Sequence, residues 1–397
     1  MSQSVCILGV TGSIGQSTLK ILQQHAKRYS VFAVTAHSRM QKLVVICQQF
    51  QPKIAVVPQA KVDELRQLLV AANLQNIEIL ADEAGLIAVA EHPEVDVVMA
   101  AIVGAAGLLP TLAAVEAGKR VLLANKEALV MSGELFMQKV AAHGATLLPI
   151  DSEHNAIFQC LPLALQQAAG RGRLAEHGIS RLLLTGSGGP FLHRPLASFA
   201  EVTPAEAVAH PNWSMGQKIS VDSATMMNKG LEFIEARWLF NCAPDDIQVV
   251  IHPQSIIHSM VQYTDGSVLA QLGQPDMRTP IAHALAFPER ISSPVPPLDF
   301  FQLSAFTFTK PEPARYPNLY LAIEACAAGQ GATTALNAAN EVAVAAFLRG
   351  ELSFSGISEL NQRALAKFAG YDARSLDAIL ALDHQSRVYA QAQLGKI

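Results

Sequence analysis

Cysteine is scarce in this sequence, and the arrangement of the few cysteines excludes two common kinds of site. The 397 residues include five of them, which lie far apart and form no Cys-x-x-Cys pair: Cys6, Cys47, Cys160, Cys242 and Cys326. An odd number with this spacing fits neither a disulfide framework nor a zinc site. Buried thiols in a reducing compartment are the simpler interpretation, so we expect a cytoplasmic protein.

Charge is scarce as well. Only 16% of the residues are charged, 50% are hydrophobic, and the formal net charge is −4. A chain with this balance lacks a general basic field for nucleic acid or an anionic membrane surface, so an anionic ligand needs a local site. We therefore expect no nucleic-acid partner. The length is sufficient for a large core divided over two or three domains.

One uncharged stretch, residues 97–115, has the length of a membrane span. It is interrupted by Gly104, Gly107 and Pro110. We interpret it as a strand at 97–103, a glycine loop and a helix opened by Pro110, and we expect no membrane association. The first residues lack a basic region and lead into a strand-like segment, so we expect no signal peptide.

The first motif is a glycine loop between a strand and a helix. A short apolar run at 5–8 is followed by Gly9-Val-Thr-Gly12-Ser-Ile-Gly15 and then by residues with helical spacing. In dinucleotide-binding folds such glycines allow a close approach to a pyrophosphate, to which the helix N-terminus offers free N–H groups. The spacing is a variant of the usual fingerprint, and a glycine turn without a ligand is the less favoured alternative.

The end of the next strand-like run, residues 29–35, bears on the choice of cofactor. A NAD-binding protein usually has Asp or Glu there for the ribose hydroxyl, but this sequence reads Ala36-His37-Ser38-Arg39. A carboxylate would repel a 2′-phosphate, whereas a guanidinium binds it. The pattern favours NADP(H), with Arg39 at the 2′-phosphate; a solvated surface arginine is the alternative.

Apolar runs and helical segments continue to alternate through the first 150 residues. The remaining strand-like runs lie at 54–57, 95–103, 120–124 and 145–150. The helical segments between them lie near 61–72, 110–117 and 135–142. Repeated strand–helix units predict an α/β fold with a parallel, doubly wound sheet.

Polar residues follow the strand-like run at 120–124. The sequence there reads Asn125-Lys126-Glu127, and ligands of open α/β sheets bind at the carboxyl ends of the strands. A lysine at this position can orient a substrate oxygen or a phosphate. The alternative is a lysine in a surface loop.

Two carboxylates follow the run at 145–150. Asp151-Ser152-Glu153 lies between that run and a helical segment that begins near Ala156. Residues two apart in an extended segment point to the same side, so Asp151 and Glu153 are placed to converge on one hard cation. On these residues alone, a solvated turn with a helix cap is the more common arrangement.

Two later segments suit an anion. Gly186-Ser187-Gly188-Gly189-Pro190 follows a strand-like run at 181–185, and glycines with a hydroxyl at such a place are typical of an anion-binding nest. A plain turn fits equally well. Farther on, Ser223, Asn228 and Lys229 supply a hydroxyl, an amide and an ammonium group, a mixture that suits a phosphate monoester.

A third carboxylate for the cation is available in the next helical segment, 231–240. Glu232 opens this segment and Glu235 lies one turn along it. Either is a candidate ligand. The alternative is that both are acids of the first turn, which the helix dipole stabilises.

The loop at 210–216, with Trp213 near its middle, is either a lid over a bound ligand or a segment packed on its own domain. After it, residues 259–263 and 268–272 predict a β-hairpin, and His258 is more consistent with a packed or dimer-face histidine than with a ligand.

Seven prolines between 288 and 317 predict a linker arm. Ala- and Leu-rich segments at 319–328, 332–348, 357–368 and 375–393 predict a helical bundle.

Several of these segments occur together in one enzyme family. They are Gly12-Ser-Ile-Gly15, Ala124-Asn-Lys-Glu127, Asp-Ser-Glu-His-Asn-Ala-Ile-Phe at 151–158, Leu-Thr-Gly-Ser-Gly-Gly-Pro-Phe at 184–191, His-Pro-Asn-Trp-Ser-Met-Gly at 210–216 and Asp-Ser-Ala-Thr-Met-Met-Asn-Lys-Gly-Leu-Glu at 222–232. With these motifs in order, the sequence resembles the 1-deoxy-D-xylulose 5-phosphate reductoisomerase family over essentially the whole chain. The family often has Gly and Lys where this sequence has Ala36-His37-Ser38-Arg39.

The resemblance implies conversion of 1-deoxy-D-xylulose 5-phosphate to 2-C-methyl-D-erythritol 4-phosphate in the non-mevalonate isoprenoid pathway, with NADPH and Mg²⁺, Mn²⁺ or Co²⁺. The metal would act as a Lewis acid while a carbon–carbon bond breaks and re-forms, and NADPH would then deliver hydride. It also implies a homodimer with an NADPH-binding Rossmann-like domain (1–150), an α+β catalytic and dimerisation domain (151–287), a linker arm (288–317) and a helical domain (318–397).

Site residues follow from the resemblance position by position. The implied metal ligands are Asp151, Glu153 and Glu232, which with Lys126 form the catalytic set. The implied substrate contacts are Lys126, Ser152, Glu153, Ser187, His210, Trp213, Met215, Ser223, Asn228, Lys229 and Glu232, where Trp213 and Met215 belong to the lid. The implied cofactor contacts are Thr11, Gly12, Ser13, Ile14, Asn125, Glu127 and Gly216, to which we add His37, Ser38 and Arg39.

Two other classes of protein fit parts of the sequence. A simple NADP-dependent dehydrogenase would share the dinucleotide-binding half but would need no metal. A non-catalytic NADPH sensor would need neither the carboxylates nor the phosphate-binding residues.

Overall fold

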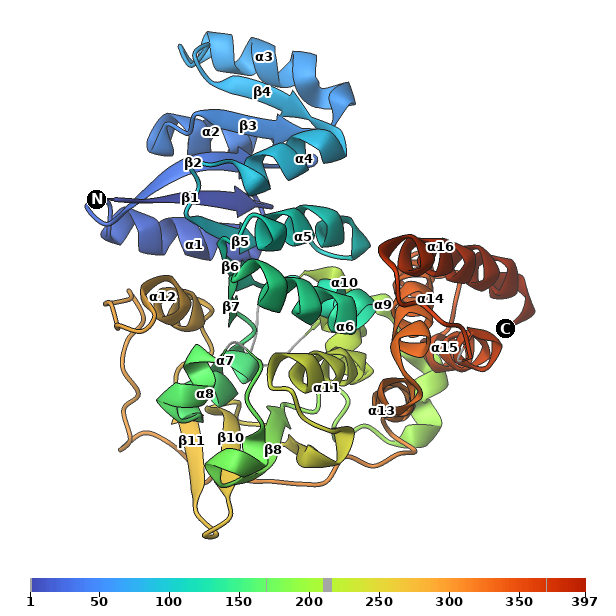
Figure 1. Cartoon of the computed structure of the whole chain (residues 1–397). Coiled ribbons are helices and arrows are strands. Elements are labelled where there is room, and N and C mark those ends of the chain that lie inside the picture. The colour runs from blue at the N-terminus through green and yellow to red at the C-terminus, as the bar shows by residue number, and fades with distance from the viewer. Residues whose placement is uncertain (1, 169, 210–215, 369) are drawn as a thin grey trace. The chain divides into compact units, whose positions relative to one another are not determined.

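The computed structural model describes residues 2–168, 170–209, 216–368 and 370–397 (Figure 1). The chain divides into two compact units. The first unit consists of residues 1–128, 138–155 and 276–296. The second unit consists of residues 129–137, 156–275 and 297–397.

The first unit contains a seven-stranded sheet in the order β4-β3-β2-β1-β5-β6-β7, in which all neighbouring strands are parallel. The strands are β1 (Gln3–Leu8), β2 (Tyr29–Thr35), β3 (Ile54–Val57), β4 (Glu78–Ala81), β5 (Val97–Ala100), β6 (Arg120–Leu123) and β7 (Thr146–Pro149). Apart from the edge strand β4, their short apolar sequences are largely buried on both faces, as is usual for parallel sheets covered by helices. The prediction of a doubly wound α/β fold is confirmed.

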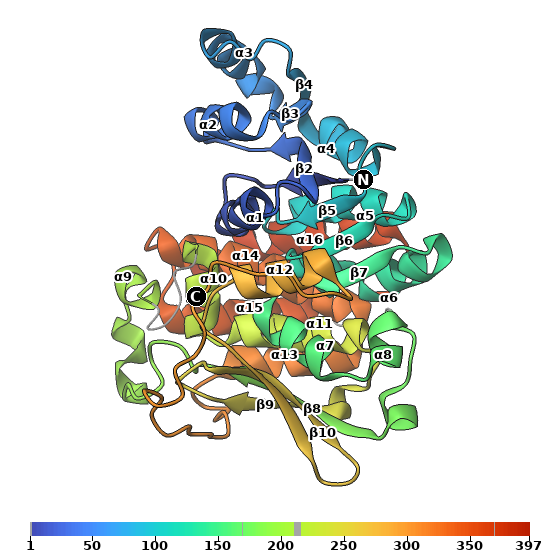
Figure 2. The same ribbon diagram turned by 90° about the vertical axis from the view of Figure 1, so that its left-hand side faces the viewer.

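Helices cover both faces of this sheet. The helices of the first unit are α1 (Ser13–Gln24), α2 (Met40–Phe50), α3 (Val62–Ala71), α4 (Asp82–Glu91), α5 (Leu108–Glu116) and α12 (Arg278–Ala286). Figure 2 shows α1, α2 and α3 on one side of the strands and α4 and α5 on the other. Helix α12 packs against α1, and its Leu285 carbonyl accepts hydrogen bonds from Tyr29 and Arg120.

The uncharged stretch at 97–115 is divided as its glycines predict. Strand β5 ends at Ala100, three residues earlier than expected, and the short 3-10 helix Ala105–Gly107 precedes α5. Helix α5 begins at Leu108, so Pro110 lies in its first turn, where a proline is tolerated. Among the described residues, no helix has both the length and the apolar character needed to cross a membrane.

The second unit contains a four-stranded sheet in the order β11-β10-β8-β9. Its strands are β8 (Ile179–Gly186), β9 (Ile247–Ile251), β10 (Ile257–Tyr263) and β11 (Val268–Leu272). Strand β10 is antiparallel to both of its neighbours, and β8 is parallel to β9. The predicted hairpin is confirmed as β10 and β11, with an Asp265 carboxylate that accepts from the Ser267 backbone N–H in the turn.

The second unit also contains a set of helices. They are α8 (Leu163–Gln167), α9 (Pro204–Ala207), α10 (Gln217–Ala224), α11 (Met227–Leu239), α13 (Pro317–Ala328), α14 (Gln330–Leu348), α15 (Phe354–Phe368) and α16 (Leu376–Gln393). The last four pack on one another and confirm the predicted bundle (orange to red in Figure 1). Between α12 and α13 the chain forms only an isolated bridge, from Thr309 to Ile251.

Two helices belong partly to each unit, α6 (Lys126–His143) and α7 (Ser152–Cys160). The sequence predicts the first from 135 and the second from about 156, and both starts are wrong. In α6 the backbone of Ser132 is non-helical, and Gly133 follows it, so the amphipathic pattern is clear only beyond this kink. The true start is fixed by Asn125, whose side-chain oxygen accepts from the Ala128 N–H.

Candidate active site

An ion pair lies at the carboxyl edge of the parallel sheet in the first unit. Lys126, the first residue of α6, follows β6, and Asp151 follows the adjacent strand β7. The Lys126 Nζ lies 2.8 Å from the Asp151 Oδ2, and the two side chains are only 12% and 17% exposed. Parallel neighbouring strands thus bring together two residues that the sequence predicts as catalytic.

The local backbone at Asp151-Ser152-Glu153 differs from the prediction. Helix α7 begins at Ser152, so the argument that residues 151 and 153 share one side of an extended segment is wrong. The carboxylate of Glu153 lies in the first turn, where the helix dipole favours negative charge. Its Oε2 accepts a hydrogen bond from the Ser152 hydroxyl. The start of α7, rather than strand alternation, therefore sets the directions of these side chains.

Glu232 occupies a deeply buried position on α11 in the second unit, where its side chain is 1% exposed. Its two oxygens accept from the Asn228 amide and the Lys229 ammonium group, one turn earlier on the same helix. A buried carboxylate needs such partners, because desolvation otherwise makes its charged form unfavourable. The structure therefore joins three predicted site residues in one hydrogen-bonded cluster: Asn228, Lys229 and Glu232.

The glycine loop after β8 passes close to this group. A Cβ atom at Gly186 would lie 2.9 Å from the Lys229 Cε, and one at Gly189 would lie 2.7 Å from the backbone oxygen of Ser223. Glycine is required at Gly189, where the neighbouring atom is backbone and φ is +70°, whereas at Gly186 a larger residue would displace the end of the Lys229 side chain. The structure thus brings the Ser187 loop, Ser223 and Lys229 together within the second unit, as expected for one phosphate site.

The dinucleotide motif has the predicted geometry. A Cβ atom at Gly15 would lie 2.6 Å from the Val10 Cα, so this glycine permits the close packing of α1 on the loop. Helix α1 begins at Ser13 after Gly12, and no side chain caps its first N–H groups. Gly12 and Ser13 are exposed. The free donors of this helix start are available to a pyrophosphate.

The predicted 2′-phosphate position contains a second cation. The Arg39 Nη1 and the Lys42 Nζ both donate to the Thr11 carbonyl, at 3.3 and 3.0 Å. Burial, and then the charge of Arg39, lower the pKa of Lys42. The sequence prediction missed Lys42, although its place three residues after Arg39, in the first turn of α2, was a usable signal.

Other predicted cofactor contacts have structural roles of their own. The Asn125 amide donates to the carbonyls of Ile102 and Gly104 as well as capping α6, and both Asn125 and Glu127 are buried. Gly216 is the N-cap of α10, and His37 and Ser38 are exposed after β2. The predicted substrate and lid residues His210, Trp213 and Met215 lie outside the described residues.

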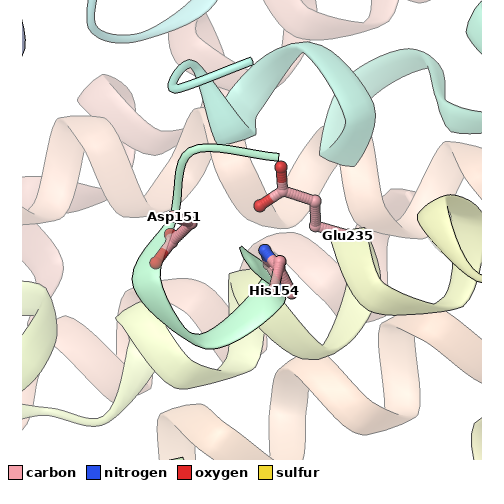
Figure 3. A group of neighbouring side chains, drawn as sticks. All are labelled: Asp151, His154 and Glu235. Carbon is pink, nitrogen blue, oxygen red and sulfur yellow. The ribbon is translucent and has the colours of Figure 1, made fainter. Parts of the chain in front are cut away.

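Two sets of side chains among the described residues have the composition of a metal site. One is the predicted set, Asp151, Glu153 and Glu232, and the other is Asp151, His154 and Glu235. Figure 3 shows the second set, with Asp151 in the turn before α7, His154 in the first turn of α7 and Glu235 on α11. The first set offers only oxygen atoms, which a hard divalent cation prefers.

His258 is close to fully buried on β10, and its Nε2 lies 3.2 Å from the Gly273 carbonyl. This arrangement agrees with the expectation of a packed histidine.

These features define a class of protein. The first unit has a doubly wound sheet that opens with a glycine-rich loop. The second unit has a cluster of hydroxyl, amide, ammonium and carboxylate groups. Together these parts are typical of a two-part NAD(P)-dependent oxidoreductase. Sequence models of one family match three parts of the chain. The model for 1-deoxy-D-xylulose 5-phosphate reductoisomerase matches residues 5–133, and models of its C-terminal domains match 147–240 and 272–389.

Curated relatives and solved structures agree with these matches. The 1-deoxy-D-xylulose 5-phosphate reductoisomerases of Shewanella sp. (strain MR-7) and Acinetobacter baumannii (strain AYE) are each 59% identical to this chain, with 100% of both sequences covered. A crystal structure of DOX-P reductoisomerase with NADPH, fosmidomycin and magnesium has a TM-score of 0.96 at 50% identity, with 99% of this chain and 98% of that chain covered. The Zymomonas mobilis enzyme in complex with NADPH has a TM-score of 0.90 at 43% identity, and both chains are fully covered. The chain belongs to the 1-deoxy-D-xylulose 5-phosphate reductoisomerase family and is an oxidoreductase.

Proposed function

We propose that this chain converts 1-deoxy-D-xylulose 5-phosphate to 2-C-methyl-D-erythritol 4-phosphate, with NADPH as reductant and a divalent metal as Lewis acid. The full-length relatives support the reaction, and the structures with NADPH and magnesium support the cofactors. The observation that carries the site assignment is the packing of the Ser187 loop against Ser223 and Lys229.

The proposed phosphate site lies in the second unit. The phosphate oxygens of a monoester accept hydrogen bonds, and this site offers four donors. They are the hydroxyl groups of Ser187 and Ser223, the Asn228 amide and the Lys229 ammonium group. Lys229 also donates to Glu232, so the side chain assigned to the phosphate contacts one assigned to the metal. Binding energy from a phosphate remote from the reacting carbons holds the substrate fragments in place. His210, Trp213 and Met215 remain predicted contacts of this region.

The proposed metal ligands are Asp151, Glu153 and Glu232. Three carboxylates fit magnesium, and manganese or cobalt accept the same oxygen ligands. The bound ion would polarise the substrate carbonyl and a neighbouring hydroxyl. Lys126 holds a proton on Nζ beside Asp151, where it balances the carboxylate charge and can donate to a developing oxyanion. Ser152, at the start of α7, is the remaining proposed substrate contact.

The proposed cofactor site is the loop from Thr11 to Ile14 together with Arg39. The first N–H groups of α1 would hold the pyrophosphate, and the Arg39 guanidinium would hold the 2′-phosphate. NADPH supplies the hydride that reduces the rearranged aldehyde. The remaining predicted contacts of the cofactor are Asn125, Glu127, Gly216, His37 and Ser38.

A metal-dependence assay separates this function from its alternatives. We expect NADPH oxidation with 1-deoxy-D-xylulose 5-phosphate to stop in excess chelator and to return with added Mg²⁺ or Mn²⁺, because the carboxylate set cannot polarise the carbonyl without its ion. A simple dehydrogenase would keep its rate in chelator. A non-catalytic sensor would bind NADPH without oxidising it. Either result contradicts the proposal.

A homodimer with a reducing, cytoplasmic location is the remaining part of the proposal. Strand β11 is an edge of the second sheet, and Val268 and Leu269 on it are 46% and 49% exposed. An apolar edge strand left open is a liability that pairing with a second copy removes. We expect light scattering on the purified chain to give twice the mass of 42.4 kDa, and replacement of Leu269 by Lys to shift it toward the monomer. A monomeric parent chain would refute this assembly.

A further inference from the structure

The loop that carries Ser187 is rich in glycine. It begins at the end of β8 and includes Gly188 and Gly189, whose φ angles are +84° and +70°. Glycine loses more conformational freedom on ordering than any other residue. A loop of this kind binds an anion well only if something else holds its backbone, because otherwise the ligand has to order it.

A buried tyrosine hydroxyl holds the loop at Gly188. Tyr316 is 1% exposed, and its hydroxyl donates to the Gly188 carbonyl at 2.9 Å. A Cβ atom at Gly188 would lie 3.2 Å from the same hydroxyl oxygen, so the phenol lies directly against this residue. Burial raises the pKa of Tyr316 to about 12, which keeps the hydroxyl protonated and able to donate.

The preceding residue holds the continuation of the loop. The Arg315 Nη1 donates to the carbonyls of Phe191 and Arg194, at 2.8 and 2.7 Å. The ring of Phe191 is buried and packs edge-on against Phe354, with ring centroids 5.3 Å apart. Two consecutive side chains at the end of the proline-rich segment therefore bind three carbonyl groups between residues 188 and 194.

We propose that Arg315 and Tyr316 are positioning residues that hold the Ser187 loop in its phosphate-binding conformation. The inference rests on the proposed assignment of Ser187 to the substrate phosphate. Neither residue needs to contact the substrate, since each acts on the backbone that carries Ser187. Helix α13 starts at Pro317, so the helical bundle and the phosphate loop are joined through this pair.

Removal of one hydroxyl tests the role of Tyr316. Tyr316→Phe keeps the ring in the core and deletes only the bond to Gly188. We expect the KM for 1-deoxy-D-xylulose 5-phosphate and the inhibition constant of inorganic phosphate to rise about three- to tenfold, the effect of one lost hydrogen bond. The kcat and the KM for NADPH should stay within about twofold, because the loop is assigned only to the phosphate.

Tyr320→Phe is the matched control. Its hydroxyl also donates to a backbone carbonyl, that of Pro311 at 2.7 Å. Tyr320 lies in the first turn of α13, the helix that Tyr316 precedes, and its hydroxyl does not hold the loop. This variant should leave all four constants unchanged. A second test variant, Arg315→Lys, keeps the charge but replaces the planar Nη1, which donates to both carbonyls, with a flexible ammonium group whose N–H directions are not fixed. We expect it to raise the same two constants.

Ser187→Ala distinguishes the phosphate assignment from the positioning role of Arg315 and Tyr316. If it leaves the inhibition constant of inorganic phosphate unchanged, the phosphate assignment itself is wrong. If Ser187→Ala weakens phosphate binding while folded Tyr316→Phe and Arg315→Lys do not, the positioning role is wrong. A fall in kcat and in NADPH affinity together with a lower melting temperature would show general destabilisation and would also overturn the positioning role.

Discussion

Replacement of Glu232 by Gln is expected to abolish turnover while NADPH binding survives. Glu232 is a fully buried carboxylate of the second unit and is assigned to the metal together with Asp151 and Glu153. Substitutions around metal ligands typically cost about 10- to 100-fold in affinity or activity, so loss of a direct ligand should cost more than about a hundredfold. The assay is NADPH oxidation across a range of Mg²⁺ concentration, with NADPH binding followed by fluorescence.

Glu235→Gln is the discriminating control. Glu235 lies on the same helix, is equally buried, and belongs to the other set of ligand-type side chains. If the ion binds the three carboxylates, this variant should need no more Mg²⁺ than the parent chain. The reverse result, an active Glu232→Gln and an inactive Glu235→Gln, would assign the metal to the set that includes His154.

Stability must be checked in the same experiment. Glu232 accepts from Lys229, and breaking a buried ion pair by removing one partner costs about 3–5 kcal/mol. A melting curve shows whether Glu232→Gln is folded. Glu153→Gln provides the same test at a less buried carboxylate in the first unit, and it too should lose its response to Mg²⁺.

The parts of the fold that the sequence predicted are those set by local pattern. Glycine spacing at 9–15, strand alternation up to 150 and the Ala-rich helices after 318 all depend on neighbours in the chain, and each is present in the structure. Strand β4 and helices α2 and α4 are not among the predicted elements, and neither is α12. Its segment, 278–286, lies just before the proline-rich arm, and it becomes a helix by packing on α1, far earlier in the sequence. Contacts of that kind leave no periodic signal for a single sequence to show.

The same distinction applies to the candidate site. The carboxyl ends of β6 and β7 pointed to Lys126 and Asp151 because parallel strands align their ends. The roles of Arg315 and Tyr316 were not visible, since a bond from residue 316 to the carbonyl at 188 has no counterpart in spacing or composition. A sequence motif cannot predict a hydrogen bond to a particular backbone carbonyl, because every residue has a carbonyl group.

Cofactor choice is expected to depend on Arg39 and Lys42 together. Both cations are held at the Thr11 carbonyl at the edge of the glycine loop. Two positive charges on one acceptor repel each other, and a 2′-phosphate between them would relieve this repulsion. A hydrogen bond to a charged group contributes roughly 1.5–3 kcal/mol. Arg39→Met and Lys42→Met should therefore each lower kcat/KM with NADPH about ten- to a hundredfold and leave kcat/KM with NADH nearly unchanged.

The test compares both cofactors in the parent chain, the two variants and the double variant. Lys61→Met, which removes a surface cation paired with Glu64 in the same unit, is the control and should change neither value. Because Arg39 and Lys42 bind one carbonyl and are assigned to one phosphate, their effects should not add, and the double variant should lose less than the product of the single losses. If Lys42→Met, like Lys61→Met, leaves kcat/KM unchanged with both cofactors, then Arg39 alone binds the 2′-phosphate. If the variants lower kcat/KM equally with NADH and NADPH, the two cations support the loop rather than select the cofactor.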